Sequence, residues 1–355
     1  MMSTSETPTM QGPVCPVPLH HDAQIVMGHG SGGRMTSELI QRVFLPRFSN
    51  PALLAGNDFA SLQAQGGRLA ISTDSHIVNP LFFPGGDIGK LAICGTINDV
   101  AMSGATPVSL TAGFILEEGL LISDLEKIAD SMQAAAAEAG VQIVAGDTKV
   151  VEKGKADGIF INTTGVGWVP QGRVIGGEQA KPGDIVLLSG TLGDHGMAVL
   201  TARGDLGFEA NIQSDVAPLN HLIAAVLEAA PHTHVLRDPT RGGLATTLNE
   251  IACQSDVSIW LDEAIIPVSQ PVKAACEMLG FDPLYIANEG KVIVIVPESE
   301  ADKALGAMKT SPYGKNAVKI GTVKEEEPGR VLLQTLIGGT RILDTLAGEI
   351  LPRIC

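Results

Sequence analysis

The sequence lacks the cysteine pairs of a metal or disulfide site, and it has no long hydrophobic run. It contains no CxxC pair, and its five cysteines stand far apart, at Cys15, Cys94, Cys253, Cys276 and Cys355. This spacing indicates neither a disulfide framework nor a zinc site. No Lys or Arg precedes Arg34, and no apolar run is long enough to span a membrane. We therefore expect a cytoplasmic protein that has no membrane partner.

The sequence is also poor in basic residues. It has 24 Lys and Arg against 39 Asp and Glu, which gives a net charge of −15 at pH 7. This charge excludes nonspecific binding to nucleic acid or to an anionic membrane. Any anionic ligand must therefore be held by local groups. With 355 residues, 45% of them hydrophobic, the chain can fill two cores, and we expect two domains.

The pattern along the chain predicts two α+β domains between two irregular ends. We expect a disordered extension rich in Pro, Ser and Thr (1–20), an N-terminal domain (21–170), a C-terminal domain (171–342) and a mobile tail (343–355). The first domain has strand-like runs at 69–74, 107–116, 141–147 and 158–169, and helical stretches at 88–103 and 123–139. The second has helical stretches near 196–203, near 218–230 and after 241–243, and strand-like runs at 184–190, 258–263, 291–298, 317–323 and 330–336.

The best-marked helix is predicted over residues 123–139. Ser123 and Glu126 have the spacing of a capping box, in which each side chain accepts a backbone N–H near the other residue. Gly140 follows the last helical residue and can adopt the left-handed conformation that ends a helix. We therefore expect this helix to begin at Ser123 and to serve as scaffold.

A glycine-rich segment, HGSGG, precedes the helix-like residues 35–44. Its glycines let backbone N–H groups turn together toward an anion, and a helix N-terminus adds positive potential. The segment lacks the Lys-Ser/Thr ending of a P-loop and follows no clear strand. Two interpretations remain open: a loop that covers phosphates, or a plain linker.

Four aspartates follow or lie within apolar sequence, at Asp58, Asp74, Asp99 and Asp147. A carboxylate without a positive partner is costly to bury, so we expect a cation near them. Oxygen ligands without His or Cys suit Mg²⁺, which completes its shell with water and nucleotide phosphates. The alternative is a helix cap or a turn, the commonest use of aspartate. Asp99 favours the metal interpretation most, because it lies inside a predicted helix where no cap is required.

Two other charged residues and one turn suit a phosphate site. Lys149 follows Asp147 closely, where a lysine could offset the charge of a phosphoryl group. Glu289, in the segment ANEGKVIVIV, could accept a proton from a substrate amide. Both residue types are also common on surfaces. The segment 238–243, DPTRGG, is either an anion-binding turn or a capped turn.

The tail ends in the residues PRIC, with Cys355 last. An exposed thiol invites oxidation and cross-linking and is usually avoided, so we expect this one to have a function. The alternative is an accidental terminus. Roughly ten extended residues at about 3.3 Å each span on the order of 30 Å. The tail could therefore move between two sites.

Together these residues resemble the hydrogenase-maturation carbamoyl dehydratases. This family belongs to the PurM-like superfamily, with aminoimidazole-ribonucleotide synthetase, selenophosphate synthetase and thiamine-phosphate kinase. The resemblance runs from about Met27 to Cys355 and includes HGSGG, STDS, NPLFFPGGDIGKLAICGTINDVAMSGA, GFILEEGL, GDTKVV, SGTLGDHG, TRGG, NEGK and PRIC. It implies a two-domain PurM-like α+β fold whose N-terminal sheet pairs with a second copy, forming a homodimer with an ATP site at its core.

The resemblance also implies roles for single residues, with ATP and Mg²⁺ as cofactors. Its motifs imply Mg²⁺–ATP carboxylates at Asp74, Asp99 and Asp147, and a mobile loop over the phosphates at His29, Gly30, Ser31, Gly32 and Gly33. They imply that Lys149 and Glu289 lie around a thiocarboxamide on Cys355. Asp58 is a further nucleotide contact, although GNDFASL departs from the acidic pair that many relatives carry there.

The activity implied by the resemblance is the ATP-dependent dehydration of an S-carbamoyl group on Cys355 to a thiocyanate. The thiocyanate would supply the cyanide ligand for the iron of a nickel–iron hydrogenase. The implied partners are a carbamoyltransferase of the HypF type and an iron-scaffold complex of the HypC–HypD type, and no nucleic acid. Two alternatives stay open: an ATP enzyme acting on a free small molecule, such as a selenophosphate or purine-type synthetase, and a noncatalytic carrier whose tail is a handle for partners.

Overall fold

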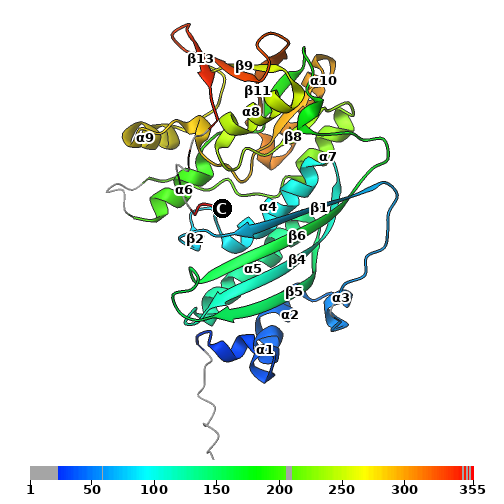
Figure 1. The fold of residues 1–355 in the computed structure, drawn as a ribbon, viewed down its shortest axis with the longest axis vertical. Coiled ribbons are helices and arrows are strands. Elements are labelled where there is room, and N and C mark those ends of the chain that lie inside the picture. The colour runs from blue at the N-terminus through cyan, green and yellow to red at the C-terminus, as the bar shows by residue number, and fades with distance from the viewer. Residues whose placement is uncertain (1–22, 58, 205–209, 346–347, 349–350, 352) are drawn as a thin grey trace, which may run out of the picture.

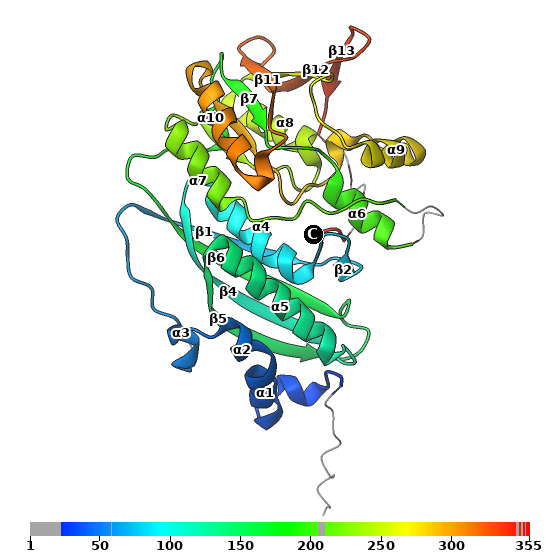
Figure 2. The ribbon, with the colours of Figure 1, turned by 180° about the vertical axis from the view of Figure 1, so that it is seen from behind.

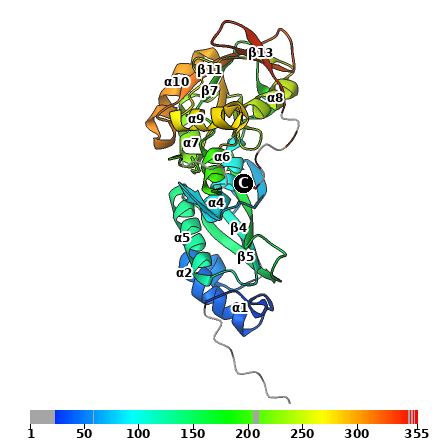
Figure 3. The same ribbon diagram turned by 90° about the vertical axis from the view of Figure 1, so that its left-hand side faces the viewer.

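The chain forms two stacked domains, with residue 355 lying between them (Figures 1 and 3). The structure, a computed structural model, describes residues 23–57, 59–204, 210–345, 348, 351 and 353–355. The extension predicted to be disordered and the predicted nucleotide contact Asp58 lie outside the described residues. The two-domain α+β fold expected from the sequence is confirmed.

The N-terminal domain is built on a four-stranded sheet in the order β1-β6-β4-β5. The β4–β5 pair is parallel and the other pairs are antiparallel. The strands are β1 (Arg68–His76), β4 (Thr106–Glu117), β5 (Gln142–Val151) and β6 (Ile159–Val169). Helices α4 (Ile88–Met102) and α5 (Ile122–Ala139) cover one face of the sheet, while the other face is open (Figures 1 and 2). Each of these elements overlaps a segment predicted from the sequence.

Helix α4 is buried on almost all sides. Lys90 and Asp99 are its two residues that are not buried. A helix that is apolar all round must pack on several elements. Helix α4 lies between the sheet of its own domain and the C-terminal domain, which explains its composition (Figure 2). Asp99 is therefore one of two residues of α4 that are not buried, and it lines a cavity.

Helix α5 begins earlier than the sequence predicted. Its N-cap is Leu121, with no side-chain cap, and Ser123 lies inside the first turn, so the predicted capping box is wrong. The first N–H of the helix is satisfied instead by the main chain, because Ile122 N donates to Ala23 O (3.0 Å). The predicted end is confirmed: Gly140 adopts the left-handed conformation, with φ 72°.

The C-terminal domain is built on a seven-stranded sheet in the order β13-β12-β9-β11-β7-β10-β8. Its strands are β7 (Ile185–Leu188), β8 (Val235–Arg237), β9 (Ser258–Asp262), β10 (Ile293–Val296), β11 (Val318–Lys324), β12 (Arg330–Gln334) and β13 (Thr340–Leu343). Its helices are α6 (Asp194–Ala202), α7 (Asn220–Ala229), α8 (Gly243–Ser255), α9 (Gln270–Leu279) and α10 (Glu298–Thr310). Helix α8 packs in the core on one side of the sheet, and α7 and α10 pack in the core on the other. The sequence did not predict β8, β13, α9 and α10.

Short elements complete the fold. They are the one-turn helices η1 (Met27–Gly30), η3 (Gly177–Gln179), η4 (Pro283–Tyr285) and η5 (Pro312–Gly314), the π-helical turn η2 (Ile40–Phe44), the helices α1 (Arg34–Leu39), α2 (Leu45–Phe48) and α3 (Pro51–Leu54), and the two-residue strands β2 (Phe82–Phe83) and β3 (Gly86–Asp87). The segment from η1 to α3 lies beside β5, at the end of the molecule far from the C-terminal domain (Figure 1). None of the described helices is long and apolar enough to cross a membrane.

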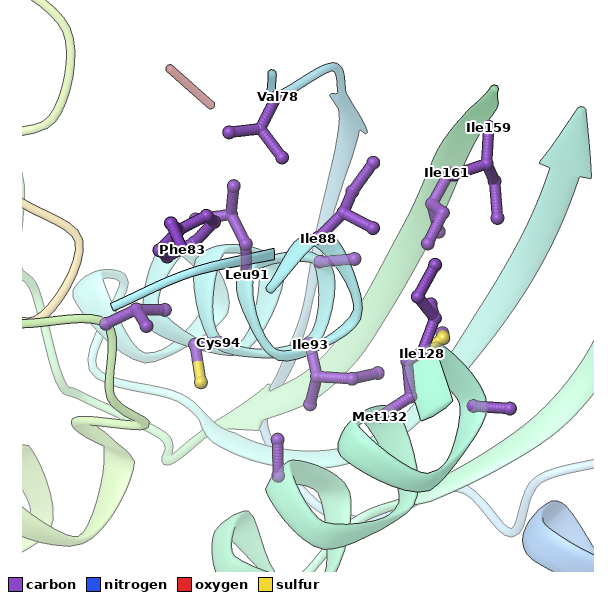
Figure 4. Close-up of a cluster of buried hydrophobic side chains, with 14 of the residues drawn as sticks. Val78, Phe83, Ile88, Leu91, Ile93, Cys94, Ile128, Met132, Ile159 and Ile161 are labelled. Atoms are coloured by element: carbon purple, nitrogen blue, oxygen red, sulfur yellow. The ribbon is translucent and has the colours of Figure 1, made fainter. Parts of the chain in front are cut away.

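The largest hydrophobic core joins the two domains. Figure 4 shows its centre, where Ile93 of α4 points toward Met132 of α5, and Leu91 of α4 lies near Phe83. The same cluster takes in residues of α6 and α9 from the C-terminal domain. It also includes Leu351 and Ile354, so the end of the chain is part of the core between the domains.

Candidate functional site

Cys355 lies in a polar pocket at the domain boundary. The pocket has a volume of about 110 Å³ and is lined by Asp74, Ser75, His76, Gly95, Asp99, Asp238, Thr240, Arg241, Glu289 and Cys355. Its acidic side chains come from β1, from α4, and from loops of the C-terminal domain. Three predicted site residues, Asp74, Asp99 and Glu289, are thus brought together with the predicted carrier thiol. We call this the carboxylate pocket.

The end of the chain is docked as an extra strand. Val78 and Ile354 form an antiparallel bridge, and Ile77 N donates to Cys355 O (3.3 Å). On the other side of the bridge, Asn79 N donates to Arg353 O (3.2 Å). The chain that follows β1 thus pairs with the tail, and this pairing places Cys355 beside the residues at the end of β1.

The Asp74 and Asp99 carboxyl groups share one wall of the pocket. Ser72 Oγ donates to Asp99 Oδ2 (2.7 Å), and Thr96 Oγ1 donates to Asp74 Oδ2 (3.4 Å). Burial, and then the neighbouring Asp99 charge, raises the pKa of Asp74 to about 6. The hydrogen bonds from Ser72 and Thr96 therefore do not offset the burial of these carboxylates and the repulsion between them. Two crowded carboxylates with oxygen donors alone fit a Mg²⁺ ion, which would relieve this repulsion.

Glu289 and Asp238 lie on the opposite wall, in the C-terminal domain. Burial, and then the Asp238 charge, raises the pKa of Glu289 well above its usual value. Burial, and then the Asp99 charge, raises the pKa of Asp238 to about 7. Asp238 can therefore exchange a proton near neutral pH, as an acid–base residue must, while burial favours the protonated form of Glu289.

The shifted pKa of Asp74 predicts how Asp74→Asn changes stability with pH. The carboxyl group ionises near pH 6 in the folded chain and at its ordinary value of 3.8 when unfolded. Its contribution to stability is therefore present below about pH 4 and is lost as the pH rises through 6. We expect Asp74→Asn to melt at a higher temperature than the wild type at pH 8, with a difference that shrinks from pH 6 to pH 4. Thermal unfolding across this range measures it, and a difference that grows toward low pH would contradict it.

Asp147 and Lys149 lie apart from the carboxylate pocket, on the open face of the sheet. Lys149 Nζ is 3.2 Å from Asp147 Oδ1, and both side chains are more than 60% exposed. They line a second pocket, of about 430 Å³, which also includes Ser75 and Asn162. Across the sheet, Ser75, Asn162, Gly113 and Asp147 stand in one row of paired residues. We call this second pocket the sheet-face pocket.

The two pockets adjoin at Ser75, which lines both. Asn162 Nδ2 holds this point, because it donates to Ser75 Oγ (3.1 Å) and to Asp74 O (2.9 Å). The three carboxylates predicted to hold metal thus divide between the pockets: Asp74 and Asp99 lie in one and Asp147 in the other. Among the residues that the structure describes, no group of three or more His, Cys, Asp or Glu side chains is arranged to hold a metal ion.

The glycine-rich loop lies beside β5. His29 is buried, and its Nδ1 accepts the backbone N–H of Val26 (3.0 Å). A Cβ added at Gly30 would lie 2.6 Å from Val150 N, so only glycine allows this close approach. Val150 adjoins Lys149. The loop therefore packs against β5 at Val150, while its residues Ser31, Gly32 and Gly33 remain exposed.

Among the titratable residues of the carboxylate pocket, the sequence assigned no role to His76 and left the roles of Asp238 and Arg241 open. Asp238 and Arg241 belong to the DPTRGG segment, but a capped turn explained this segment as well as an anion-binding turn did. The Arg241 charge lowers the pKa of Asp74, although less than burial and Asp99 raise it. Burial, and then Arg241, lowers the pKa of His76 to about 4, so this ring is neutral. Arg241 is therefore a cation close to the acidic groups of the pocket.

Comparison with known proteins gives consistent matches over the chain. The family "AIR synthase related protein, N-terminal domain" matches residues 56–169, and "AIR synthase related protein, C-terminal domain" matches residues 181–334. Carbamoyl dehydratase HypE of Cupriavidus necator is 56% identical over 94% of this chain and 95% of its own length.

Two solved structures are also similar to the chain. The crystal structure of hydrogenase maturation protein HypE in complex with ATP superposes with a TM-score of 0.89, at 50% identity, over 93% of this chain and 99% of the other. A crystal structure of a HypE–HypF complex superposes with a TM-score of 0.76, at 52% identity, over 88% of this chain and 100% of the other.

Proposed function

Because the chain belongs to the carbamoyl dehydratase HypE family, within the AIR synthase related proteins, we propose that it dehydrates an S-carbamoyl group carried on Cys355. The product is a thiocyanate, which provides the cyanide ligand for the iron of a nickel–iron hydrogenase. One observation carries the proposal: Cys355 lies in the same pocket as Asp74, Asp99 and Glu289. A carrier thiol must meet the catalytic groups in this way.

The reaction removes an oxygen and two protons from the carbamoyl group. ATP, which a similar protein binds, supplies the phosphoryl group that turns this oxygen into a leaving group. The carbon–oxygen bond breaks as phosphate departs, and the nitrogen loses both protons as the triple bond forms. One S-carbamoyl group and one ATP thus give one thiocyanate, one ADP and one phosphate. The Cys355 sulfur keeps its bond to carbon throughout.

Glu289 is the base in this proposal. It lines the pocket that holds Cys355 and is nearly fully buried. Because burial and nearby acids raise its pKa, its carboxylate binds a proton strongly once it is ionised. Asp238 lies on the same wall, and a pKa of about 7 suits it to pass the proton toward solvent. The two acids together give the amide protons a path away from the nitrogen.

The remaining predicted residues serve the nucleotide in this proposal. Asp74 and Asp99 would hold Mg²⁺, which supplies positive charge to the phosphates. Asp147 and Lys149 would act from the sheet-face pocket, where the ammonium offsets phosphoryl charge. The loop from His29 to Gly33 would cover the phosphates from the β5 side. The role of Asp58 stays a prediction from the sequence.

The proposal also covers the assembly and the partners. The open sheet face exposes Leu69, Ile71 and Ile115, which supports a homodimer in which two such faces meet. A similar protein forms a complex with HypF, so we propose a HypF-type carbamoyltransferase as the donor. We also propose an acceptor of the HypC–HypD type and a cytoplasmic location. For loading, the end of the chain must leave the pocket, because Cys355 is only partly exposed there.

Mass spectrometry of the peptide that ends in Cys355 tests the proposed reaction. The Cys355 thiol of the full chain is first carbamoylated in the absence of nucleotide, and the loaded chain is then divided into samples with and without MgATP. We expect the loaded peptide to lose the mass of one water in the sample with MgATP and to keep its mass in the sample without it. An adduct that keeps its mass in MgATP would overturn the dehydratase proposal and favour a noncatalytic carrier.

A further inference from the structure

We propose that His195 is a positioning residue that holds the end of the chain in the carboxylate pocket, and that Ser214 orients its ring for this task. The His195 Nε2 atom lies 2.6 Å from Ile354 O, the carbonyl next to the carrier cysteine. Its Nδ1 atom lies 2.8 Å from Ser214 Oγ. Both ring nitrogens are therefore used, one on the tail and one on a support within the C-terminal domain.

The neighbours of the ring determine which nitrogen carries the proton. Val216 N donates to Ser214 Oγ (3.1 Å), which leaves the serine hydrogen free to point at His195 Nδ1. The ring then carries its own hydrogen on Nε2 and donates it to Ile354 O. Burial lowers the pKa of His195, which agrees with a neutral ring. Phe83 packs edge-on against the ring, with centroids 5.5 Å apart, and restricts its rotation.

The His195 bond to the tail is buried, whereas the side-chain bond from Arg203 to the tail is exposed. Arg353 O accepts from Asn79 N (3.2 Å) and from Arg203 Nη2 (2.9 Å), and the Arg203 bond is exposed. Water can replace an exposed bond when the tail leaves. His195 is fully buried, so its N–H would lose its partner in a place where water does not readily enter. Among these two side-chain bonds, departure of the tail therefore costs more at His195 than at Arg203.

The segment that contacts the His195 ring, residues 214–215, also contacts Glu289. Asp215, next to Ser214, accepts from Glu289 N (3.0 Å) at Oδ1 and from Lys291 Nζ (2.8 Å) at Oδ2. A Cβ added at Gly290 would lie 1.7 Å from Asp215 O, so the two segments are in close contact. Residues 214–215 thus set the position of the tail, through His195, and the position of Glu289. In the proposed reaction, this common support aligns the group on Cys355 with its base.

The accessibility of the Cys355 thiol tests the docking function of His195. The full chain, without nucleotide or partner, is treated with iodoacetamide, and the modification of each cysteine is followed by peptide mass spectrometry. We expect His195→Leu, which has no N–H, to speed modification of Cys355 about tenfold. His195→Gln keeps an N–H at the same distance from the backbone, and we expect it to restore a rate near that of the wild type.

The chain provides its own controls. The thiol of Cys253 is exposed and distant in sequence from the tail, so its rate serves as the internal reference. His221 also donates from Nε2 to a carbonyl, Glu138 O (3.0 Å), but at an exposed site. His221→Leu should leave the Cys355 rate unchanged. If His195→Leu unfolds, the buried Cys94 and Cys276 become reactive, and Ser214→Ala then takes its place, with an expected severalfold increase at Cys355.

Two results would overturn the proposal: an unchanged Cys355 rate in the folded leucine variant, or a glutamine variant that reacts as fast as the leucine variant. For Ser214→Ala the overturning result is again an unchanged rate. The alignment of the thiol with Glu289 rests on the proposed function, whereas the docking assay needs neither ATP nor a carbamoyl donor. A failure of His195 to hold the tail is thus distinguishable from a failure of the dehydratase reaction.

Discussion

Cys355→Ala abolishes carbamoyl uptake and product formation, because it removes the sulfur atom that carries the substrate through the whole reaction. The loss should be complete, since none of the groups in the carboxylate pocket can replace a thiol as carrier. Cys355 is partly exposed and contributes a small side chain, so the free energy of unfolding should change by less than about 1 kcal/mol. Mass spectrometry of the terminal peptide measures loading, and thermal unfolding with and without MgATP shows that the nucleotide site is intact.

Cys253→Ala is the matched control for this change. Cys253 is also exposed, and its thiol lies against Gly329 O (3.6 Å), far from the carboxylate pocket. This variant should load and dehydrate like the wild type. An enzyme that acts on a free small molecule would instead keep its full ATP turnover in Cys355→Ala. That result would exclude the carrier role and favour a synthetase of the purine or selenophosphate kind.

Asp99→Asn should lower the rate of water loss by about 100-fold or more while Cys355 remains fully loadable. The asparagine has nearly the same shape and can still accept the hydrogen bond from Ser72 Oγ, so the helix should fold normally. What disappears is the negative charge that would hold Mg²⁺ beside Asp74. A single-turnover assay on the preloaded chain, with MgATP in excess, separates the dehydration step from loading.

Asp124→Asn controls for the amide substitution itself. Asp124 lies in the first turn of α5 and pairs with Lys127 (2.9 Å) on the surface. We expect wild-type rates from this variant. If Asp99→Asn also dehydrated at the wild-type rate, the carboxylate inside α4 would be a structural group, and Mg²⁺–ATP would have to be held elsewhere.

Much of the fold followed from the sequence, because periodicity and turn residues act locally. The strands and helices of the N-terminal domain come from runs whose apolar residues recur with strand or helix spacing, and the end of α5 comes from Gly140. The start of α5 could not be predicted, because Ala23, about a hundred residues earlier, satisfies its first N–H. Helices α9 and α10 were not predicted, although the apolar residues of α9 are gathered on one face more clearly than those of α5.

The sequence alone determined which residue types could perform the chemistry. A carboxylate inside an apolar helix and a cysteine at the end of a tail are improbable without a function, and Asp99 and Cys355 lie in one pocket. The resemblance of the whole chain to the carbamoyl dehydratases then predicted which reaction these residues perform. These conclusions needed no distances, since they depend on residue type and neighbouring sequence.

Only the tertiary structure decided how these residues are grouped. It put Asp74 and Asp99 with Cys355, and Asp147 with Lys149 on the open sheet face. It added Asp238 and Arg241 from a turn that the sequence left ambiguous, and it revealed the His195 bond to the tail. The partners in this bond are 159 residues apart, and their contact depends on how two domains pack. A local sequence pattern cannot predict this contact. The residues around His195 in the sequence carry no information about Ile354, and only the packing of the two domains brings the two residues together.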